Sequence, residues 1–436
     1  MNPEVKFKTV DIISLGCSKN LVDSESLMRQ LSANGIRVAH DPERPKGEVV
    51  VINTCGFIGD AKEESIDTIL NFAEAKKRGK IKRLYVMGCL SQRYFEQLGT
   101  EIPEVDKFYG KFDWQGIVSE IGATYRRDLM NDRVLTTPSH YAYLKISEGC
   151  NRTCSYCAIP IITGKHKSRP IEDIVAEAEG LARKGVKELQ VIAQDLSFYG
   201  YDLYKKSRLA ELVENLSDIK GIEWIRLHYA YPAGFPKDIL EVMASNGKVC
   251  RYIDLALQHI SDNMLTKMRR NITKRQTIDL LSEIRGKVPD ICIRTTLITG
   301  HPGETERDFE ELKEFVAAAK FDRLGVFPYS HEEGTYSWKN YEDDVPDEVK
   351  QSRAEEIMSL QRDISNEKNS KLVGQRLKVM IDRFETDEYV GRTEFDSPEV
   401  DQEVHIAAGC KELNVGELYD AVITSHDDYD LTATVK

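Results

Sequence analysis

The chain has 436 residues and carries 60 Lys and Arg against 72 Asp and Glu, a net charge of −12. Hydrophobic residues make up 41% and charged residues 30%, a balance that excludes a disordered or fibrous chain, and the length predicts two or three domains. The negative net charge argues against a protein whose main role is to bind the phosphates of nucleic acids. We expect a cytoplasmic protein without membrane contact. No apolar run approaches the ~18 residues of a membrane span, and the opening MNPEVKFKTVDII lacks an apolar signal core.

The first predicted domain, residues 1–125, alternates strands and helices. Four apolar runs are predicted to be strands, at residues 9–16, 49–54, 84–88 and 105–110. Between them, LVDSESLMRQLSANG and AKEESIDTILNFAEAKKRG have apolar residues at helical spacing and end at a glycine. This alternation predicts an N-terminal parallel α/β domain, with helices on the faces of the sheet. The polar stretch 123–139 is the expected linker.

The second predicted domain, residues 136–366, repeats the strand–helix unit six times. Its strand candidates are residues 141–147, 188–195, 223–229, 252–258, 291–300 and 323–330. A closed barrel of this kind needs eight units, so six units predict an open, partial (β/α)6 barrel. A long charged helix follows, at roughly residues 346–371.

The third predicted domain, residues 368–436, changes to an apolar period of two. Five short runs separated by turn residues are predicted to be strands: RLKVMIDRF, EYVGRTEF, EVHIAA, LYDAVITSHD and DLTATV. Five strands in about 60 residues predict a small antiparallel β-barrel of the OB-like type. The fold class is therefore α/β with a small terminal barrel.

Three cysteines, Cys150, Cys154 and Cys157, are spaced C-x₃-C-x₂-C in EGCNRTCSYCAIP, directly after the first barrel strand. In a protein that is not exported, cysteines favour metal ligation over disulfides. Three thiolates can hold an iron–sulfur cube and leave one iron open to a cofactor or substrate, at the barrel edge where chemistry is normally done. A zinc site or three unrelated thiols is the alternative, although the paired C-x₂-C motifs of zinc ribbons are absent.

The run CNRTCSYC, with Tyr156 before the last cysteine, resembles the signature of radical S-adenosylmethionine enzymes. The resemblance implies that these three cysteines hold a [4Fe-4S] cluster whose open iron binds S-adenosylmethionine, with Tyr156 near the cofactor. Reductive cleavage of the cofactor would release a 5′-deoxyadenosyl radical that takes hydrogen from an unactivated carbon. The protein would supply positioning and exclude competing reactions.

Cys17, Cys55 and Cys89 are far apart in the sequence, yet their contexts agree. Each follows an apolar strand at the turn into a helix, in IISLGCSKN, VVINTCGF and YVMGCLSQR. In a parallel sheet these turns share the edge at which ligands bind, beside helix N-termini that favour thiolate. The three thiolates should therefore converge on one cluster. The alternative is three buried structural thiols, since free cysteine is often interior.

The order of these domains resembles the methylthiotransferase family over nearly the whole chain. In that family the N-terminal cysteines, here Cys17, Cys55 and Cys89, bind a second [4Fe-4S] cluster whose open iron carries a sulfur species. S-adenosylmethionine serves as methyl donor and radical source, and the C-terminal barrel is a substrate-handling TRAM domain. The resemblance also implies an electron donor, such as flavodoxin or ferredoxin, and a source of sulfur.

Weaker candidates for contact with S-adenosylmethionine, also by resemblance, are Gln194 and Asp195 at a strand end, and Gly300 and Gly303 in LITGHPGETERDFEEL. An ordinary strand-to-helix turn with an acidic first helical turn explains the two glycines equally well. The remaining cysteines match no ligand position of the family and are expected to be core or incidental residues: Cys250, Cys292 and Cys410.

Two branches of the family compete. One modifies adenosine in transfer RNA, and the other modifies the β-carbon of an aspartate in small-subunit ribosomal protein S-twelve. The words LGCSKNLVDSE, AQDLSFYG, LALQHISDNML and YSHEEGT resemble the ribosomal-protein branch, whereas the tRNA branch usually has glutamine where Ser18 stands. We therefore expect the ribosomal protein as substrate, with the tRNA enzyme as the alternative and contact with RNA left open.

The charge distribution gives an independent argument for the same substrate. Residues 370–436 hold seven Lys and Arg against fifteen Asp and Glu, including Glu399, Asp401, Glu403, Asp427, Asp428 and Asp430. An acidic terminal barrel would repel RNA and attract a basic ribosomal protein. Solvated surface charge is the simpler explanation of such residues.

A protein of another class, a non-catalytic iron–sulfur electron carrier or an RNA-binding protein, stays an alternative. It would need a fourth thiolate to complete each cluster. Neither cysteine motif contains one, and six strand–helix units are more scaffold than a passive carrier needs.

Overall fold

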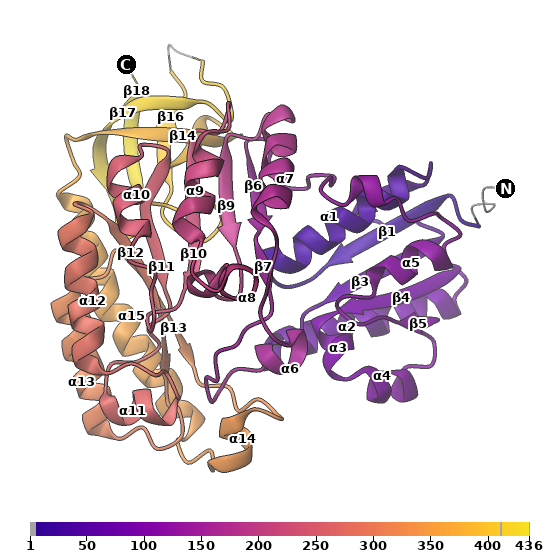
Figure 1. Ribbon diagram of the computed structural model, residues 1–436, viewed down its shortest axis with the longest axis horizontal. Helices are drawn as coiled ribbons and strands as arrows, with labels where there is room; N and C mark the ends of the chain where they lie inside the picture. The colour runs from indigo at the N-terminus through magenta and orange to yellow at the C-terminus, as the bar shows by residue number, and fades with distance from the viewer. Residues whose placement is uncertain (1–5, 410–411, 436) are drawn as a thin grey trace.

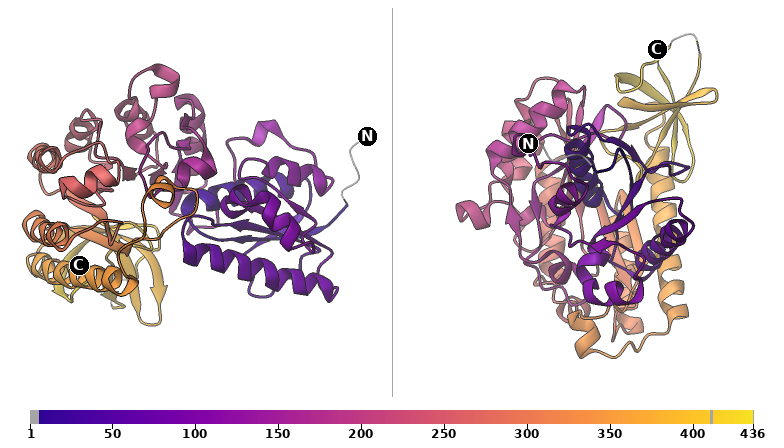
Figure 2. Two further views of the ribbon diagram at one scale, coloured as in Figure 1. Left: turned by 90° about the horizontal axis from the view of Figure 1, so that it is seen from below. Right: turned by 90° about the vertical axis from the view of Figure 1, so that its right-hand side faces the viewer.

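The computed structural model describes residues 6–409 and 412–435. Figure 1 and the turned views of Figure 2 show two sheet-containing bodies side by side, with a small barrel against one end of the larger body. Within the described residues, no helix is both long and apolar enough to span a bilayer.

The first sheet is five-stranded and parallel, in the order β2-β1-β3-β4-β5. Its strands are β1 (Thr9–Ser14), β2 (Arg37–His40), β3 (Val49–Thr54), β4 (Arg83–Gly88) and β5 (Lys107–Phe108). Its helices are α1 (Ser18–Ser32), α2 (Gly59–Lys77), α3 (Cys89–Arg93), α4 (Phe95–Glu101) and α5 (Trp114–Glu120). The central strand β3 reads VVVINT and is buried throughout, because helices cover both faces of the sheet.

This domain confirms the predicted parallel α/β fold, with one strand that the sequence did not predict. The missed strand is the edge strand β2, RVAH, whose residues are exposed or half-buried. A half-exposed edge strand needs no apolar run, so hydrophobic patterning does not detect it.

The second sheet has six parallel strands in the order β13-β12-β11-β10-β9-β6. Its strands are β6 (Tyr141–Lys145), β9 (Glu188–Ile192), β10 (Trp224–Ala230), β11 (Val249–Leu255), β12 (Cys292–Thr299) and β13 (Arg323–Pro328). The main covering helices are α7 (Ile171–Arg183), α9 (Leu209–Ser217), α10 (Ile239–Ser245), α12 (Lys274–Lys287), α13 (Glu306–Ala319) and α15 (Asp347–Ser370). All six predicted strands are present, and the open sheet confirms the partial (β/α)6 barrel.

The two faces of this sheet differ in chemistry. Leu189, Val191 and Leu227 belong to the apolar core that the strands share with the covering helices. The alternate residues, such as Gln190 and His228, are buried and polar, so by strand alternation they line the concave interior. Buried polar groups need hydrogen-bond partners, and His228 Nε2 lies 2.6 Å from Gln190 Oε1. The barrel therefore has a polar interior rather than an apolar one.

The C-terminal sheet closes into a barrel in the order β14-β15-β16-β18-β17. Its strands are β14 (Arg376–Glu385), β15 (Glu388–Thr393), β16 (Val404–Ala407), β17 (Leu418–His426) and β18 (Leu431–Val435). The pairings are antiparallel except for β16 with β18, which is parallel. The predicted small OB-like barrel is confirmed, with this one parallel pair added.

The small barrel packs against the N-terminal ends of the second sheet. Met380 of β14 lies in one apolar cluster with Trp224, Cys250 and Cys292, which stand at or near the starts of β10, β11 and β12. Cys250 and Cys292 are therefore core residues, as the sequence predicted. Cys410 lies outside the described residues.

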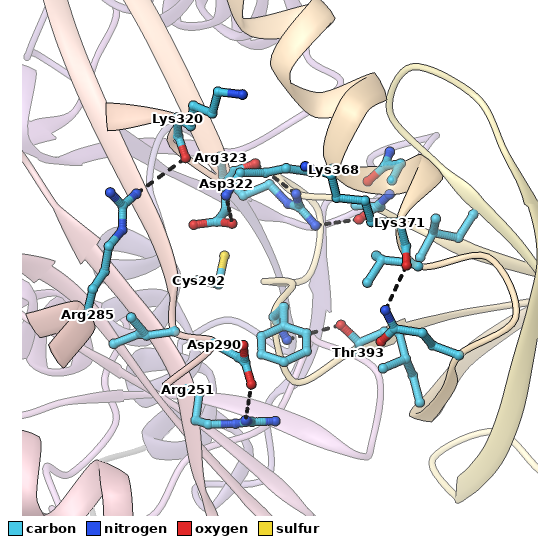
Figure 3. Close-up of a pocket in the computed structure, with 18 of the residues that line it drawn as sticks. Arg251, Arg285, Asp290, Cys292, Lys320, Asp322, Arg323, Lys368, Lys371 and Thr393 are labelled. Atoms are coloured by element: carbon cyan, nitrogen blue, oxygen red, sulfur yellow. Dashed lines mark hydrogen bonds and ion pairs between the residues drawn. The ribbon is translucent and has the colours of Figure 1, made fainter. Parts of the chain in front are cut away.

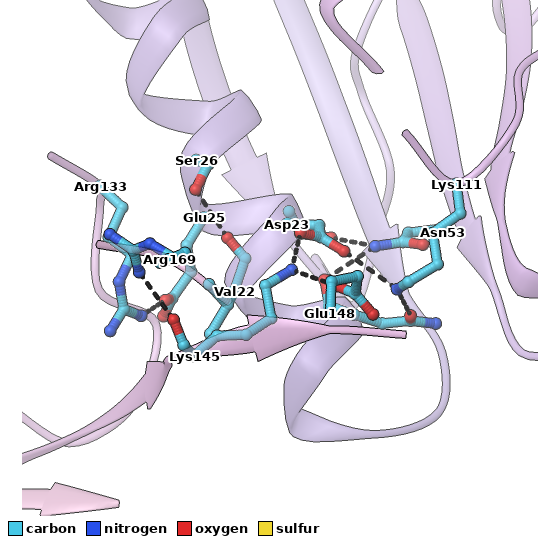
Figure 4. A network of polar contacts seen from close by, with 12 residues as sticks. Val22, Asp23, Glu25, Ser26, Asn53, Lys111, Arg133, Lys145, Glu148 and Arg169 are labelled. Atoms are coloured by element: carbon cyan, nitrogen blue, oxygen red, sulfur yellow. Dashed lines mark hydrogen bonds and ion pairs between the residues drawn. The ribbon is translucent and has the colours of Figure 1, made fainter. Parts of the chain in front are cut away.

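The predicted linker, residues 123–139, is held between the first two domains. It contains a short 3-10 helix, η1 (Arg127–Leu129), and Arg133, which is buried. The Arg133 guanidinium pairs with Glu25 of α1 and, at 2.9 Å, with Glu177 of α7; Figure 4 shows it at one end of a larger polar network. The segment therefore fixes the two domains relative to each other.

Candidate active site

The three N-terminal cysteines lie at one edge of the first sheet. Cys17 is the N-cap of α1 after β1, Cys55 directly follows β3, and Cys89 follows β4 as the first residue of α3. Because β1, β3 and β4 are neighbours in the sheet, their ends meet at the same edge. The approach is close: a Cβ on Gly16, which has φ +87°, would lie 3.0 Å from Cys55 Sγ. The shared position that the sequence predicted is present.

Asn20 connects all three cysteine loops, and the sequence analysis missed it. Its Nδ2 donates to the carbonyl of Leu15 at 3.1 Å and to the carbonyl of Thr54, beside Cys55, at 3.0 Å. Its Oδ1 accepts from the Cys89 thiol at 3.6 Å and from Lys111 Nζ at 3.1 Å. An asparagine in the first turn of a helix looks ordinary in sequence, so no local pattern indicates this role.

The electrostatics of this site differ between its cysteines. Desolvation raises the pKa of Cys17, but Lys19, Lys111 and nearby backbone N–H groups outweigh it, so the net shift is downward. Desolvation raises the pKa of Cys55, and raises that of Cys89 to about 12 despite the charge of Lys111. A coordinating metal deprotonates a thiol outright. Cys17 is therefore the thiol that loses its proton most readily, whereas Cys55 and Cys89 would need a bound metal to do so.

The second cysteine set lies in the loop between β7 (Ser147–Glu148) and α6 (Ile159–Thr163), beyond the end of β6. Cys150 Sγ accepts the backbone N–H of Arg152 at 3.4 Å. Cys154 Sγ accepts from the Arg270 guanidinium at 3.1 Å. The loop is anchored through Ser155, whose backbone N–H donates to the carbonyl of Met268 at 3.0 Å. The loop is thus ordered by contacts on both sides.

Burial raises the pKa of Cys150 to about 11 and also raises that of Cys157, where the neighbouring thiols add to the effect. Three thiols gathered this way gain by binding a metal that takes their protons. Within the described residues, no three His, Cys, Asp or Glu side chains converge on a single metal ion. In a cubic cluster each of the three thiolates binds a different iron. Three cysteines that hold such a cluster therefore do not need to meet at one metal ion.

Of the residues expected near S-adenosylmethionine, Tyr156 and Gln194 lie in the polar surroundings of this loop. Tyr156 OH accepts from Arg270 at 3.1 Å, and its ring meets His301 edge to face, with the centroids 6.5 Å apart. Gln194 donates to Glu148, while its buried Oε1 has no hydrogen-bond partner among the described residues. A buried acceptor without a partner suits a ligand that brings a donor.

Asp195, Gly300 and Gly303 already make hydrogen bonds within the protein. Asp195 accepts from Arg152 Nε at 2.7 Å and from the Ser197 N–H at 2.9 Å. The Gly300 N–H donates to Glu304 at 2.7 Å, and the Gly303 N–H donates to Asp344 at 2.8 Å. These contacts favour the ordinary strand-to-helix turn for the glycines and a positioning role for Asp195, which orients Arg152.

Segments that carry one cysteine of each set meet at the domain boundary. Cys89 shares an apolar cluster with Ala158, which directly follows Cys157, and with Ile162. In Figure 1 the short helices α3 and α6 that carry these residues lie next to each other. A buried ion pair holds the boundary closed: Glu332 accepts from Arg93 at 2.9 Å and from Lys62 at 2.7 Å.

A chain of charges runs between the two sites. Lys111 donates to Asp23 at 3.1 Å, and Lys145 of the barrel donates to Asp23 at 2.5 Å and to Glu148 at 2.9 Å. Figure 4 shows these side chains in line across the boundary. Burial raises the pKa of Glu148, but Lys145 and Lys111 overcome this and lower it to about 2. Lys145 thus links Asp23 of the N-terminal domain to Glu148, which lies beside the second cysteine loop.

A cavity of about 680 Å³ lies at the opposite end of the barrel, against the C-terminal domain. Figure 3 shows cations of the larger domain around it, with Thr393 of the C-terminal barrel on the other side. Two of these cations pair with acids of the barrel: Arg251 with Glu394 at 2.9 Å, and Arg323 with Asp396 at 2.5 Å. The cavity lies between the two domains and is lined by Cys292 but by no cysteine of the two sets.

The acidic residues of the C-terminal barrel have roles within the molecule. Glu399 accepts from Tyr141 OH at 2.9 Å, and Asp401 accepts from Tyr252 OH at 2.8 Å and pairs with Arg294. Four further acids have partners nearby. Glu403 pairs with Arg383, and Asp428 accepts a hydrogen bond from Asn366. Asp427 accepts backbone N–H groups of its own turn, and Asp430 accepts the Glu403 N–H. Some of the local acidity therefore serves docking and turn structure, so the charge of the barrel is partly paired within the molecule.

Comparison with known families gives three matches along the chain. Residues 9–110 match a family described as uncharacterized protein family UPF0004, residues 144–316 match the radical SAM superfamily, and residues 373–435 match the TRAM domain. The order agrees with the three bodies of the structure.

Curated relatives are similar over nearly their whole length. A protein of Phocaeicola vulgatus named ribosomal protein uS12 methylthiotransferase RimO is 59% identical over 431 residues, covering 99% of this chain and 100% of the relative. Relatives of the same name from Bacteroides thetaiotaomicron and Porphyromonas gingivalis are 60% identical over 431 residues and 61% over 427 residues. They cover 99% and 98% of this chain, and 99% and 98% of their own lengths.

Solved structures share the fold at low identity. The radical S-adenosylmethionine methyltransferase TsrM from Kitasatospora setae is 14% identical, with a TM-score of 0.55, over 87% of this chain and 79% of TsrM. The cobalamin-dependent S-adenosylmethionine radical enzyme OxsB is 11% identical, with a TM-score of 0.53, over 81% of this chain and 56% of OxsB.

Proposed function

The chain belongs to the family of ribosomal protein uS12 methylthiotransferases, and on that premise we propose that it adds a methylthio group to the β-carbon of an aspartate of uS12, the small-subunit ribosomal protein S-twelve. It is a radical S-adenosylmethionine enzyme with two [4Fe-4S] clusters. When bound, these groups supply the radical that activates the aspartate carbon, the methyl group and the site for sulfur.

We assign the barrel cluster to Cys150, Cys154 and Cys157, and the sulfur-carrying cluster to Cys17, Cys55 and Cys89. The observation that carries this assignment is the packing of α3, which begins at Cys89, against α6, which follows the loop of Cys157, because a methylthio group can reach a substrate radical only if the two sites are neighbours.

The surrounding residues hold and shield the site. Arg270 and the backbone N–H of Arg152 donate to the sulfurs of Cys154 and Cys150 and so hold these two side chains in place. Arg152 is in turn fixed by Asp195 at 2.7 Å and lies over the Tyr231 ring at 4.0 Å. Gln194 presents a free buried acceptor, suited to a donor on S-adenosylmethionine.

The electron donor is proposed to be a flavodoxin or ferredoxin, with a separate source of sulfur. The cytoplasm is the proposed location, where both the ribosome and reduced carriers are present. Contact with ribosomal RNA during the reaction is compatible with this scheme.

Mass spectrometry of uS12 and of transfer RNA tests the proposal, in cells that have or lack the active chain. We expect a methylthio mass increment on one uS12 aspartate only when the chain is active, and unchanged tRNA. In cells that contain only the Cys154→Ala variant, we expect uS12 to stay unmodified, as in cells that lack the chain. An increment on tRNA adenosine, with unmodified uS12, would assign the chain to the tRNA branch instead.

A further inference from the structure

Lys19 is a buried cation without an acidic partner. It stands in the first turn of α1, two residues after Cys17, and only 9% of its surface is exposed. Its Nζ lies 3.5 Å from the centroid of the Tyr229 ring, which belongs to β10 of the barrel. Among residues 6–409 and 412–435, no carboxylate lies within 4.0 Å of this Nζ and no side chain accepts a hydrogen bond from it.

Other cations of the interior, buried or half-buried, have carboxylate partners. Lys111 and Lys145 share Asp23, and Arg294 pairs with Asp254 at 3.2 Å. A buried charge is retained only when it is paired or otherwise compensated, and an aromatic face compensates a cation only in part. Lys19 is therefore prepared for an anion that the protein itself does not supply.

Lys19 lies where the N-terminal domain meets the barrel. It stands in the first turn of α1, directly after the N-cap Cys17 and Ser18, and its Nζ lies over the ring of Tyr229, near the end of the barrel strand β10. It thus lies between the N-terminal cysteine set and the barrel.

Tyr229 is held in place to present its ring there. Its backbone has φ +64°, in the left-handed region that tyrosine rarely adopts, and its N–H donates to Asp254 Oδ2 at 3.2 Å. The residue is 37% exposed, so Tyr229 can be reached from solvent. Strain of this kind persists only where the surroundings enforce it.

We propose that Lys19, supported by the face of Tyr229, binds the side-chain carboxylate of the substrate aspartate and so selects aspartate over asparagine. This assignment rests on the proposed function, since it takes uS12 as the substrate. A competing role for Lys19 is neutralisation of the thiolates at Cys17, which would affect cluster binding but not the choice between aspartate and asparagine.

Equilibrium binding of labelled uS12 to the cluster-loaded enzyme separates these roles. Two forms of uS12 are compared, one natural and one with asparagine at the target position. For the wild-type enzyme we expect binding of the aspartate form to be about tenfold tighter or more, since a site built for a polar group rejects the analogue that lacks it. Lys19→Met should abolish the preference, and Lys19→Arg should keep part of it because the charge remains while the geometry changes.

Lys62→Met is the matched control, because Lys62 is also a lysine at the domain boundary but pairs with Glu332. It should keep the preference for aspartate. Iron and sulfide are measured in every variant, and binding is expressed per loaded enzyme.

Retention of the full aspartate preference in Lys19→Met would overturn the assignment and leave the proposed function intact. Equal binding of both forms by the wild-type enzyme would also overturn it, because no residue would then read the carboxylate. Absence of binding to either form by the wild-type enzyme would remove the proposed function and this assignment together.

Discussion

Cys89 of the N-terminal domain lies in one apolar cluster with Ala158 of the barrel, the residue that follows Cys157. Sites predicted from separate motifs in two domains are therefore adjacent in space. The contact is maintained by buried charge at its border rather than by a large apolar interface, which makes the apposition of the two sites sensitive to single charged residues.

Glu332→Gln should loosen this boundary. The carboxylate is 4% exposed and is the partner of both Arg93 and Lys62, and leaving a buried cation without its partner typically costs about 3–5 kcal/mol. Hydrogen exchange in α3 and α6 should rise, and methylthiolation should fall more than S-adenosylmethionine cleavage.

Glu333→Gln is its control, because the neighbouring Glu333 is exposed and contributes only its backbone carbonyl to Arg93. Equal hydrogen exchange in the two variants would show that the Glu332 carboxylate does not hold the boundary.

Replacement of barrel cysteines should halve the metal content. If each set of three holds one [4Fe-4S] cluster, anaerobically purified protein contains about eight iron atoms, and Cys150→Ala retains about four. Cys292→Ala is the control, since Cys292 is buried in the seam with the C-terminal barrel, and it should keep the full load. A full load in a variant that lacks Cys150, Cys154 and Cys157 would disprove the barrel site.

Asp308 should make the stability of the barrel sensitive to acid. Burial raises the pKa of Asp308, but hydrogen bonds from Ser261, Thr305 and Asn263 lower it to about 2. A carboxyl with a lowered folded pKa stabilises the fold above its unfolded pKa of about 4, and this stabilisation is lost as the pH falls towards 2. The effect corresponds to about 2 kcal/mol.

Asp308→Asn should therefore be less stable than wild type at neutral pH, with a smaller further loss between pH 4 and pH 2. Hydrogen exchange of α13 measures this locally. Glu310→Gln on the same helix, whose side chain is half exposed, should follow the wild type. Parallel pH profiles for Asp308→Asn and wild type would contradict the account.

Buried apolar runs account for many of the strands that were predicted correctly. The fully buried strands β3 and β9 have such runs, whereas the half-exposed edge strand β2 does not. The barrel strand β13 is not buried but was predicted because its sequence RLGVFP is largely apolar. The six cysteines proposed to hold clusters stand out in the sequence because their spacing or their place after a strand is a local signal. Asn20 and Lys111 have no local signal, since their partners lie on other strands and loops.

The acidic C-terminal barrel illustrates the same limit. The acidic charge was visible in the sequence, but the cations that pair with it, such as Arg294 and Arg323, lie far earlier in the chain. Composition alone does not show which acid pairs with which cation. Charge segregation along a chain therefore does not identify an external partner until internal pairing has been counted.

The ion pair between Asp396 and Arg323 predicts that Asp396→Asn weakens the attachment of the C-terminal barrel. Asp396 is 1% exposed and pairs with Arg323 at 2.5 Å, so its loss leaves a buried guanidinium with less compensation and should cost about 3 kcal/mol or more. A lower melting temperature of the C-terminal unit is expected by calorimetry. Asp387→Asn, at an exposed turn, should melt like the wild type, and identical melting of both variants would show that the pair does not dock the barrel.

The central claim is that the two cysteine sets perform separate parts of one reaction. The most direct measurement quantifies 5′-deoxyadenosine and methylthiolated uS12 in the same anaerobic reaction, for wild type, Cys154→Ala and Cys55→Ala. The account predicts both products for wild type, neither for Cys154→Ala, and 5′-deoxyadenosine without methylthiolated uS12 for Cys55→Ala. Methylthiolated uS12 at the wild-type level from Cys55→Ala would contradict it, because the N-terminal set would then be only structural.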